Sequence, residues 1–129
     1  TGRTRSINRG QWDVTHLNAL LDDANSHHAL IFKALTRSLT IRREQAAFSP
    51  EAFQQFIAGD SKHLVLLRDC TQQSILVIAS FADHGQSIAW PMHPDLTFSK
   101  AHDLLTDSSY QIGAPVALQP YQVLWLHLN

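Results

Sequence analysis

The longest regular pattern of apolar and polar positions runs from His28 to about Gln45. Apolar residues recur there at helical spacing, and charged or hydroxyl side chains fall on the opposite side. The apolar positions are Leu30, Ile31, Ala34, Leu35 and Leu39. The pattern predicts an amphipathic helix, which would be marginal in water without a partner for its apolar stripe. Because the residues that follow predict strands, we expect that partner to be a sheet.

A shorter helix is predicted just before this one. Asp13 is a suitable N-cap, and the apolar residues Leu17, Leu20, Leu21 and Ala24 follow on one face. Asn25-Ser26 interrupts the pattern, and Ser26 is itself a suitable N-cap for the long helix. The two helices therefore form a predicted αα-hairpin, and Pro50 prevents the second helix from continuing.

Beyond Pro50 the pattern changes to short apolar runs separated by turn residues at intervals of about ten residues. The predicted strands are Phe53–Ile57, Lys62–Asp69, Ile75–Ala79, Ser87–Trp90, Ala101–Leu105, Ala114–Leu118 and Tyr121–Leu126. This rhythm is typical of an antiparallel β-sandwich. The runs Leu64–Leu67 and Ile75–Ala79 are continuously apolar, which suggests strands that are covered on both faces. The predicted fold class is α+β, an N-terminal αα-hairpin followed by an antiparallel sandwich.

Composition narrows the possible partners. The chain has 129 residues, of which 44% are apolar, and a formal charge of −1, which suits one globular domain. No block of like charge is present, so we expect neither nucleic acid nor an anionic membrane as a partner. No apolar run approaches the ~20 residues of a membrane span. The single Cys70 excludes an internal disulfide and fits a cytoplasmic location.

Few residues suggest chemistry. The eight histidines lack metal-ligand spacing, and we predict neither a metal site nor a cofactor. Cys70 ends an apolar strand and suits a structural thiol better than a nucleophile. Trp90, next to Pro91, either stacks on a sugar ring or anchors a loop, and the second role is the commoner one. Trp125 alternates with apolar neighbours and is expected in the core.

Three stretches resemble one family. They are Gly2–Arg9 (with Ile7-Asn8-Arg9), Ile41–Phe48, and Asp103–Leu105 followed by Leu118–Leu126 (Leu-Gln-Pro-Tyr-Gln-Val-Leu-Trp-Leu). Together they resemble the C-terminal part of sucrose phosphorylase-type enzymes of the α-amylase superfamily of glycoside hydrolases. The resemblance implies that residues 1–48 are the end of a (β/α)8 barrel and that residues 49–129 are the C-terminal β-domain. The long helix would then be the last barrel helix.

The resemblance also implies an activity outside these residues. A barrel needs about 250 residues, and the chain does not begin with Met, so we expect it to be the last part of a longer protein. Family enzymes form a covalent glucosyl intermediate on one carboxylate, and phosphate then accepts the glucosyl unit. No carboxylate here matches those catalytic groups, including Asp13, Asp22, Asp23 and Glu44. Arg9 and Asn8 resemble residues near the glucosyl-binding subsite, where an arginine would hold sugar hydroxyls.

The expected partners are therefore the catalytic barrel of the same polypeptide and, in the whole enzyme, a sugar substrate and phosphate. Two alternatives come from other classes of protein. The chain could be a carbohydrate-binding module that uses Trp90 and the loop after it. It could also be an oligomerisation domain, because an uncovered helical stripe would favour a homodimer through the αα-hairpin.

Overall fold

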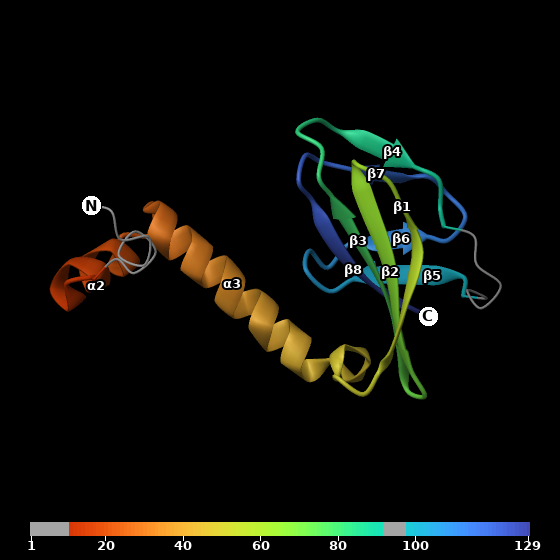
Figure 1. Cartoon of the computed structure of the whole chain (residues 1–129), viewed down its shortest axis with the longest axis horizontal. Helices are drawn as coiled ribbons and strands as arrows, with labels where there is room; N and C mark the ends of the chain where they lie inside the picture. Colours follow the sequence, from red (N-terminus) through yellow and green to blue (C-terminus); the bar gives the residue numbers. More distant parts are fainter. Residues whose placement is uncertain (1–10, 92–97) are drawn as a thin grey trace, which may run out of the picture. The chain divides into compact units, whose positions relative to one another are not determined.

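The structure, a computed structural model, describes residues 11–91 and 98–129 (Figure 1). The chain divides into two compact units, residues 1–39 and 40–129, and each is described by itself. The expected boundary between residues 48 and 49, which separates the end of a barrel from a β-domain, stays a prediction.

The first unit contains helix α2, Val14–Asp22, and the beginning of helix α3, His27–Glu44. Both predicted N-caps are confirmed. The Asp13 carboxylate accepts a hydrogen bond from the His16 backbone N–H at 2.9 Å, and the Ser26 hydroxyl accepts one from the Ala29 N–H at 3.0 Å. The Ser26 hydroxyl also donates to the Leu20 carbonyl of α2, so one side chain ends the first helix and begins the second.

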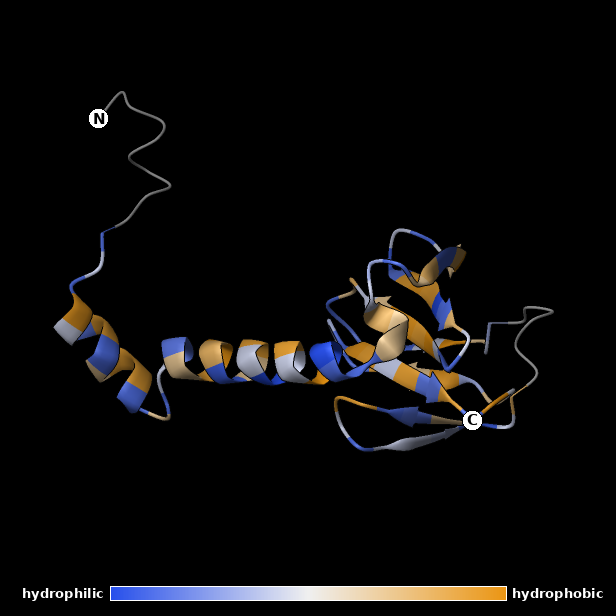
Figure 2. Cartoon of the chain, turned by 90° about the horizontal axis from the view of Figure 1, so that it is seen from below, coloured by the Kyte–Doolittle hydropathy of each residue, from blue (hydrophilic) through white to orange (hydrophobic). Residues whose placement is uncertain are grey.

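Helix α3 is amphipathic, and its apolar residues are exposed. Figure 2 shows apolar and polar residues alternating along the helix, and none of its residues is buried. More than half of the side-chain surface is exposed at Leu30, Ile31, Phe32, Leu35 and Leu39. Among the described residues, no helix has the length and apolar character needed to cross a membrane.

The second unit is built on two antiparallel sheets (Figure 1). A six-stranded sheet has the order β1-β2-β3-β8-β5-β6, and a two-stranded sheet pairs β4 with β7. The strands are β1 Phe53–Gly59, β2 His63–Cys70, β3 Gln73–Ser80, β4 Gln86–Ile88, β5 Lys100–Asp103, β6 Ser109–Gln111, β7 Val116–Leu118 and β8 Val123–Leu128. The predicted α+β class, two helices followed by an antiparallel β-domain, is confirmed.

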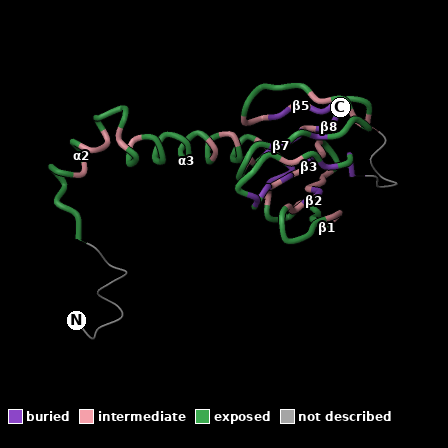
Figure 3. Tube along the Cα trace, turned by 90° about the horizontal axis from the view of Figure 1, so that it is seen from above, coloured by how far each residue is buried: buried purple, intermediate pink, exposed green. Residues whose placement is uncertain are grey.

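The core lies between the two sheets. Alternate residues of β2, β3 and β8 pack there with residues of the small sheet. Figure 3 shows buried stretches along these strands. Its largest fully buried side chains include Leu76, Ile78, Leu118, Leu124 and Leu126. This arrangement follows from the period-two alternation of a strand, which places every second apolar residue on the same face.

Three strand predictions need correction near the C-terminus. Strand β5 ends at Asp103 and does not reach Leu105, because the Asp103 side chain accepts backbone hydrogen bonds from Leu105 and Thr106 and starts a turn. The strand predicted at Ala114–Leu118 begins only at Val116 of β7, and strand β6, Ser109–Gln111, was not predicted. The last strand begins at Val123, because Tyr121 has a φ of 55° and so leaves the extended conformation.

Candidate functional site at the helix-to-sheet junction

The best-defined site of the second unit is the place where helix α3 meets the six-stranded sheet. After Glu44 a short 3₁₀ helix, η1 (Ala46–Phe48), lies on the sheet. Ala47 is fully buried and Phe48 nearly so, and both pack against the buried Ile75 of β3. The Phe48 ring meets the Trp125 ring of β8 edge-on, with 4.8 Å between the ring centres.

Polar side chains hold the same segment to the sheet. Arg68 of β2 donates through Nε to the Ala47 carbonyl at 3.0 Å and through Nη2 to the Ser49 carbonyl at 2.6 Å. Its Nη1 donates to the side-chain oxygen of Gln54 on β1 at 2.7 Å. The planar guanidinium suits this task, because its donors point in fixed directions toward several acceptors.

Gln73 of β3 completes the junction. Its side-chain amide donates to Oε1 of Gln45 at 2.6 Å and accepts a hydrogen bond from the Ala47 N–H at 3.1 Å. We call Gln45, Arg68 and Gln73 the junction clamp. Together with Phe48 it fixes the direction in which the end of α3, from Thr40 onward, joins the β-domain.

The junction clamp was not identified from the sequence, although a signal for it exists. Arg68 follows the apolar run Leu64–Leu67, so a central strand carries a cation on one face. A half-buried arginine in such a strand needs acceptors, but the sequence does not show which segment supplies them. The glutamines carry no comparable signal, because surface glutamines are common.

A second polar cluster surrounds Asp103, which is fully buried. One carboxylate oxygen accepts hydrogen bonds from the backbone N–H groups of Trp125 at 2.9 Å and Leu105 at 3.3 Å. The other accepts from the N–H and hydroxyl of Thr106. Burial, and then the charge of Asp103, raise the pKa of the Tyr110 hydroxyl. With its oxygens turned toward these donors, Asp103 stabilises the β5–β6 hairpin.

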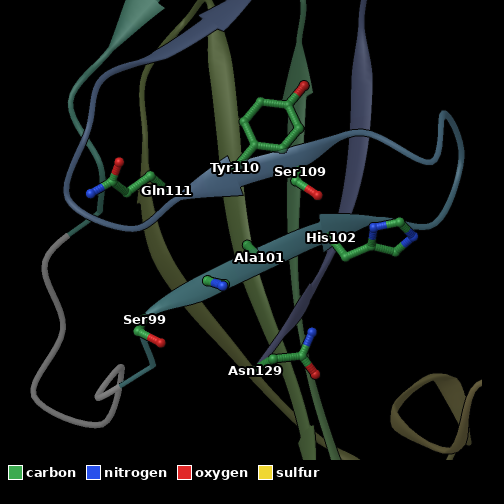
Figure 4. Close-up of a pocket in the computed structure, with 8 residues that line it drawn as sticks. Ser99, Ala101, His102, Ser109, Tyr110, Gln111 and Asn129 are labelled. Atoms are coloured by element: carbon green, nitrogen blue, oxygen red, sulfur yellow. The ribbon is translucent and has the colours of Figure 1, made fainter.

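An open groove of about 860 Å³ lies along β5, β6 and the C-terminal residue (Figure 4). Its polar lining side chains are Ser99, Lys100, His102, Ser109, Tyr110, Gln111 and Asn129. Those labelled in Figure 4 point in different directions and do not converge on one point. None of the described lining side chains is a carboxylate, whereas retaining glycosyl transfer uses two.

The residues singled out from the sequence have different outcomes. Asn8 and Arg9 lie outside the described residues, so their substrate-binding role stays a prediction. Trp90 is only 5% exposed and belongs to the core between the sheets, so the carbohydrate-binding alternative loses its stacking surface. Trp125 was predicted in the core but is only partly buried, and it packs against the buried Ile75 and Phe48.

The described histidines and the cysteine form no reactive cluster. No group of three or more metal-ligating side chains occurs in residues 11–91 and 98–129. Three of the described histidines pair with nearby aspartates, at 3.0 Å for His63 with Asp60, 2.8 Å for His84 with Asp83 and 2.9 Å for His102 with Asp107. A backbone hydrogen bond from Lys62 lowers the pKa of Asp60. The Cys70 thiol lies 3.5 Å from the Gln73 carbonyl and packs with the cluster around Ile75.

The second unit is an antiparallel β-domain, and the junction clamp ties the segment after helix α3 to its larger sheet. Residues 55–127 match the family described as the C-terminal domain of amylosucrase. The match covers more than half of the chain, and the chain belongs to this amylosucrase C-terminal domain family.

A curated relative and several solved structures agree with this assignment. Glucosylglycerate phosphorylase of Spirochaeta thermophila is 26% identical over 138 aligned residues, which cover 98% of this chain and 23% of that protein. A variant of AmyP in complex with maltotriose has a TM-score of 0.75 at 14% identity, and covers 83% of this chain and 22% of its own. Trehalose-6-phosphate hydrolase of Bacillus licheniformis has a TM-score of 0.66 at 23% identity, and the match covers 86% of this chain and 20% of the hydrolase chain.

The structural similarities establish the fold alone, because the identities are low. The chain spans less than a quarter of the length of each of these proteins. The family match confirms the prediction that the chain resembles the C-terminal domain of an enzyme.

Proposed function

We propose that this chain is the non-catalytic C-terminal domain of a longer retaining enzyme. In our proposal the enzyme transfers a glucosyl unit from sucrose or a related α-glucoside to phosphate. The observation that carries the proposal is the match with glucosylglycerate phosphorylase, which extends over 98% of the chain and therefore includes the helices as well as the β-domain.

The role within that enzyme is structural. The exposed stripe of α3 suits burial against a preceding catalytic barrel, as expected for the last helix of that barrel. The junction clamp ties the end of this helix to the sheet through Arg68 and Gln73. The β-domain would then hold the last helix in place, and the catalytic carboxylates would lie on the barrel.

The substrate follows from the relative. Glucosylglycerate is the first donor to try, because the curated relative is named for it, and sucrose is the second. The full-length polypeptide, incubated with either donor and inorganic phosphate, is expected to release glucose 1-phosphate. The 129-residue chain alone is expected to release none. Turnover by the purified chain would overturn the proposed structural role, and a full-length protein inactive on α-glucosides would overturn the proposed reaction.

A homodimer through the αα-hairpin stays a prediction for the chain without its barrel. The exposed residues of α3 would associate in water when nothing else covers them. Light scattering of the 129-residue chain is expected to show a dimer or larger species, and a monomer at all concentrations would contradict it.

A further inference from the structure

A cavity of about 400 Å³ borders the junction clamp at the end of helix α3. All of its lining residues come from one stretch of the chain, between residues 42 and 50. The α-helix ends there at Glu44, and Gln45 is extended, with a φ of −100° and a ψ of 118°, before η1 begins. Because the chain changes direction at Gln45, residues on both sides of it line the same cavity.

The cavity carries two positive charges and one negative charge, on Arg42, Arg43 and Glu44. All three residues are exposed. In residues 11–91 and 98–129, no ion pair or side-chain hydrogen bond joins any of them to another residue. Consecutive residues of a helix point about 100° apart, so these neighbours in sequence do not neutralise one another. Their charged groups are therefore available to a ligand.

Two uncharged side chains add hydrogen-bond donors to the same cavity. Oε1 of Gln45 accepts a hydrogen bond from Gln73 at 2.6 Å, which leaves the amide nitrogen of Gln45 to donate. The Ser49 hydroxyl accepts from the Glu51 N–H at 3.3 Å and keeps its own proton for donation. Nη2 of Arg68 lies 2.6 Å from the Ser49 carbonyl oxygen and brings a third positive charge close to the cavity.

This combination of groups suits a phosphate that is attached to a sugar. Guanidinium groups bind phosphate oxygens through parallel hydrogen bonds, and two of them are present. The Glu44 carboxylate would repel a bare phosphate, whereas it can accept hydrogen bonds from sugar hydroxyls. Phe48 and Pro50 give the cavity an apolar part, which suits the C–H groups of a sugar ring. A ligand with a phosphate at one end and hydroxyls at the other matches all of these features.

We propose that this cavity is a binding site for a hexose monophosphate. Its phosphate binds Arg42 and Arg43, and a sugar hydroxyl donates to Glu44. Cations in the last turn of a helix also stabilise the helix, a role that needs no ligand, so the test measures binding. The proposal goes beyond the proposed function, and only the choice of the first probe rests on it, because glucose 1-phosphate is the product of that reaction.

The experiment is equilibrium dialysis of the native full-length polypeptide against radiolabelled glucose 1-phosphate and, in a second series, glucose 6-phosphate. The variants are the double change Arg42→Gln/Arg43→Gln and the single change Glu44→Gln. The matched control is Arg37→Gln, at an exposed arginine of α3 that does not line the cavity. Thermal unfolding confirms that each variant is folded, and the two single arginine variants are used if the double variant is not.

We expect the double variant to bind one molecule fewer per chain than the unchanged protein and the control, with at least one of the two sugar phosphates. At this site its affinity should fall at least about tenfold, because two charge-assisted contacts are lost. Glu44→Gln should shift the preference at least about threefold from the sugar phosphate toward inorganic phosphate, because it removes an acceptor for hydroxyls and a charge that repels the bare anion. A purely helix-stabilising role would change neither quantity.

Equal stoichiometry in the double variant and the control, with both sugar phosphates, would overturn the proposal. Inorganic phosphate that displaces the label as well as the unlabelled sugar phosphate does would reduce the ligand to the anion and would also overturn it. Phosphorolysis is assayed separately. A polypeptide that loses one binding site in the double variant, but releases no glucose 1-phosphate from any α-glucoside, would refute the proposed reaction and leave this site standing.

Discussion

Replacement of Arg68 by methionine tests the junction clamp directly. The change keeps an unbranched side chain of similar length and removes the three hydrogen bonds to Ala47, Ser49 and Gln54. Hydrogen bonds to charged groups contribute about 1.5–3 kcal/mol each. The bond to Gln54 is exposed, so we expect water to replace it at little cost. Because Arg68 is half-buried, we count each of its two hydrogen bonds to backbone carbonyls at the lower value of about 1.5 kcal/mol. Their loss should then lower the free energy of unfolding by about 3 kcal/mol.

The assay is urea unfolding of the 129-residue chain, followed by tryptophan fluorescence and by trypsin cleavage at Arg42 and Arg43. Arg68→Met is expected to lower the free energy of unfolding by about 3 kcal/mol and to speed cleavage in the last turn of α3. Arg68→Lys should recover less than half of the loss, because an ammonium group lacks the planar fork of donors. Arg37→Met, at an exposed position on α3, is the control and should change stability by less than about 0.5 kcal/mol.

The reasoning fails if Arg68→Met costs no more than Arg37→Met. It also fails if Arg68→Lys is as stable as the unchanged protein, because charge alone would then explain the effect. In the full-length enzyme the same variant should inactivate at a lower temperature, with its turnover at low temperature nearly unchanged.

Three further changes have expected outcomes. Asp103→Leu removes the acceptor of the part-buried Trp125 backbone N–H and should destabilise the chain by about 1–3 kcal/mol in urea unfolding, whereas a neutral result would contradict its structural role. Gly59→Ala places a Cβ 2.9 Å from the His63 carbonyl oxygen, so the melting temperature should fall, and an unchanged value would show that the β1–β2 turn relaxes. The pKa of Asp60 is lowered from 3.8, so the stability it adds is present above that pH and is lost as the pH falls through the lowered value. Asp60→Asn should therefore make acid unfolding less steep, and an unchanged profile would refute this.

Much of the fold could be predicted from the chain's periodicity. The Asp13 and Ser26 caps and the strands β2 and β3 follow from local patterns of capping and apolar runs, which depend little on distant residues. The ends of the strands near the C-terminus were harder to predict. The turn conformation of Tyr121 and the turn after Asp103 depend on contacts with other strands, which the local sequence does not encode.

The candidate site was predictable only in part. The continuous apolar runs of β2 and β3 indicated that both faces of the sheet are covered, and the structure covers one face with the small sheet. The junction clamp depends on pairs far apart in the chain, such as Gln45 with Gln73 and Arg68 with Ala47. No local spacing brings such residues together, so the structure was needed to identify them.

The mass of the native polypeptide tests the central claim most directly. An antibody raised against residues 40–129 would be used on an extract of the source cells. We predict a single band several times heavier than the 14.5 kDa of this chain, because a barrel of about 250 residues or more would precede it. A band at 14.5 kDa would contradict the account, since a domain that stands alone supports no barrel.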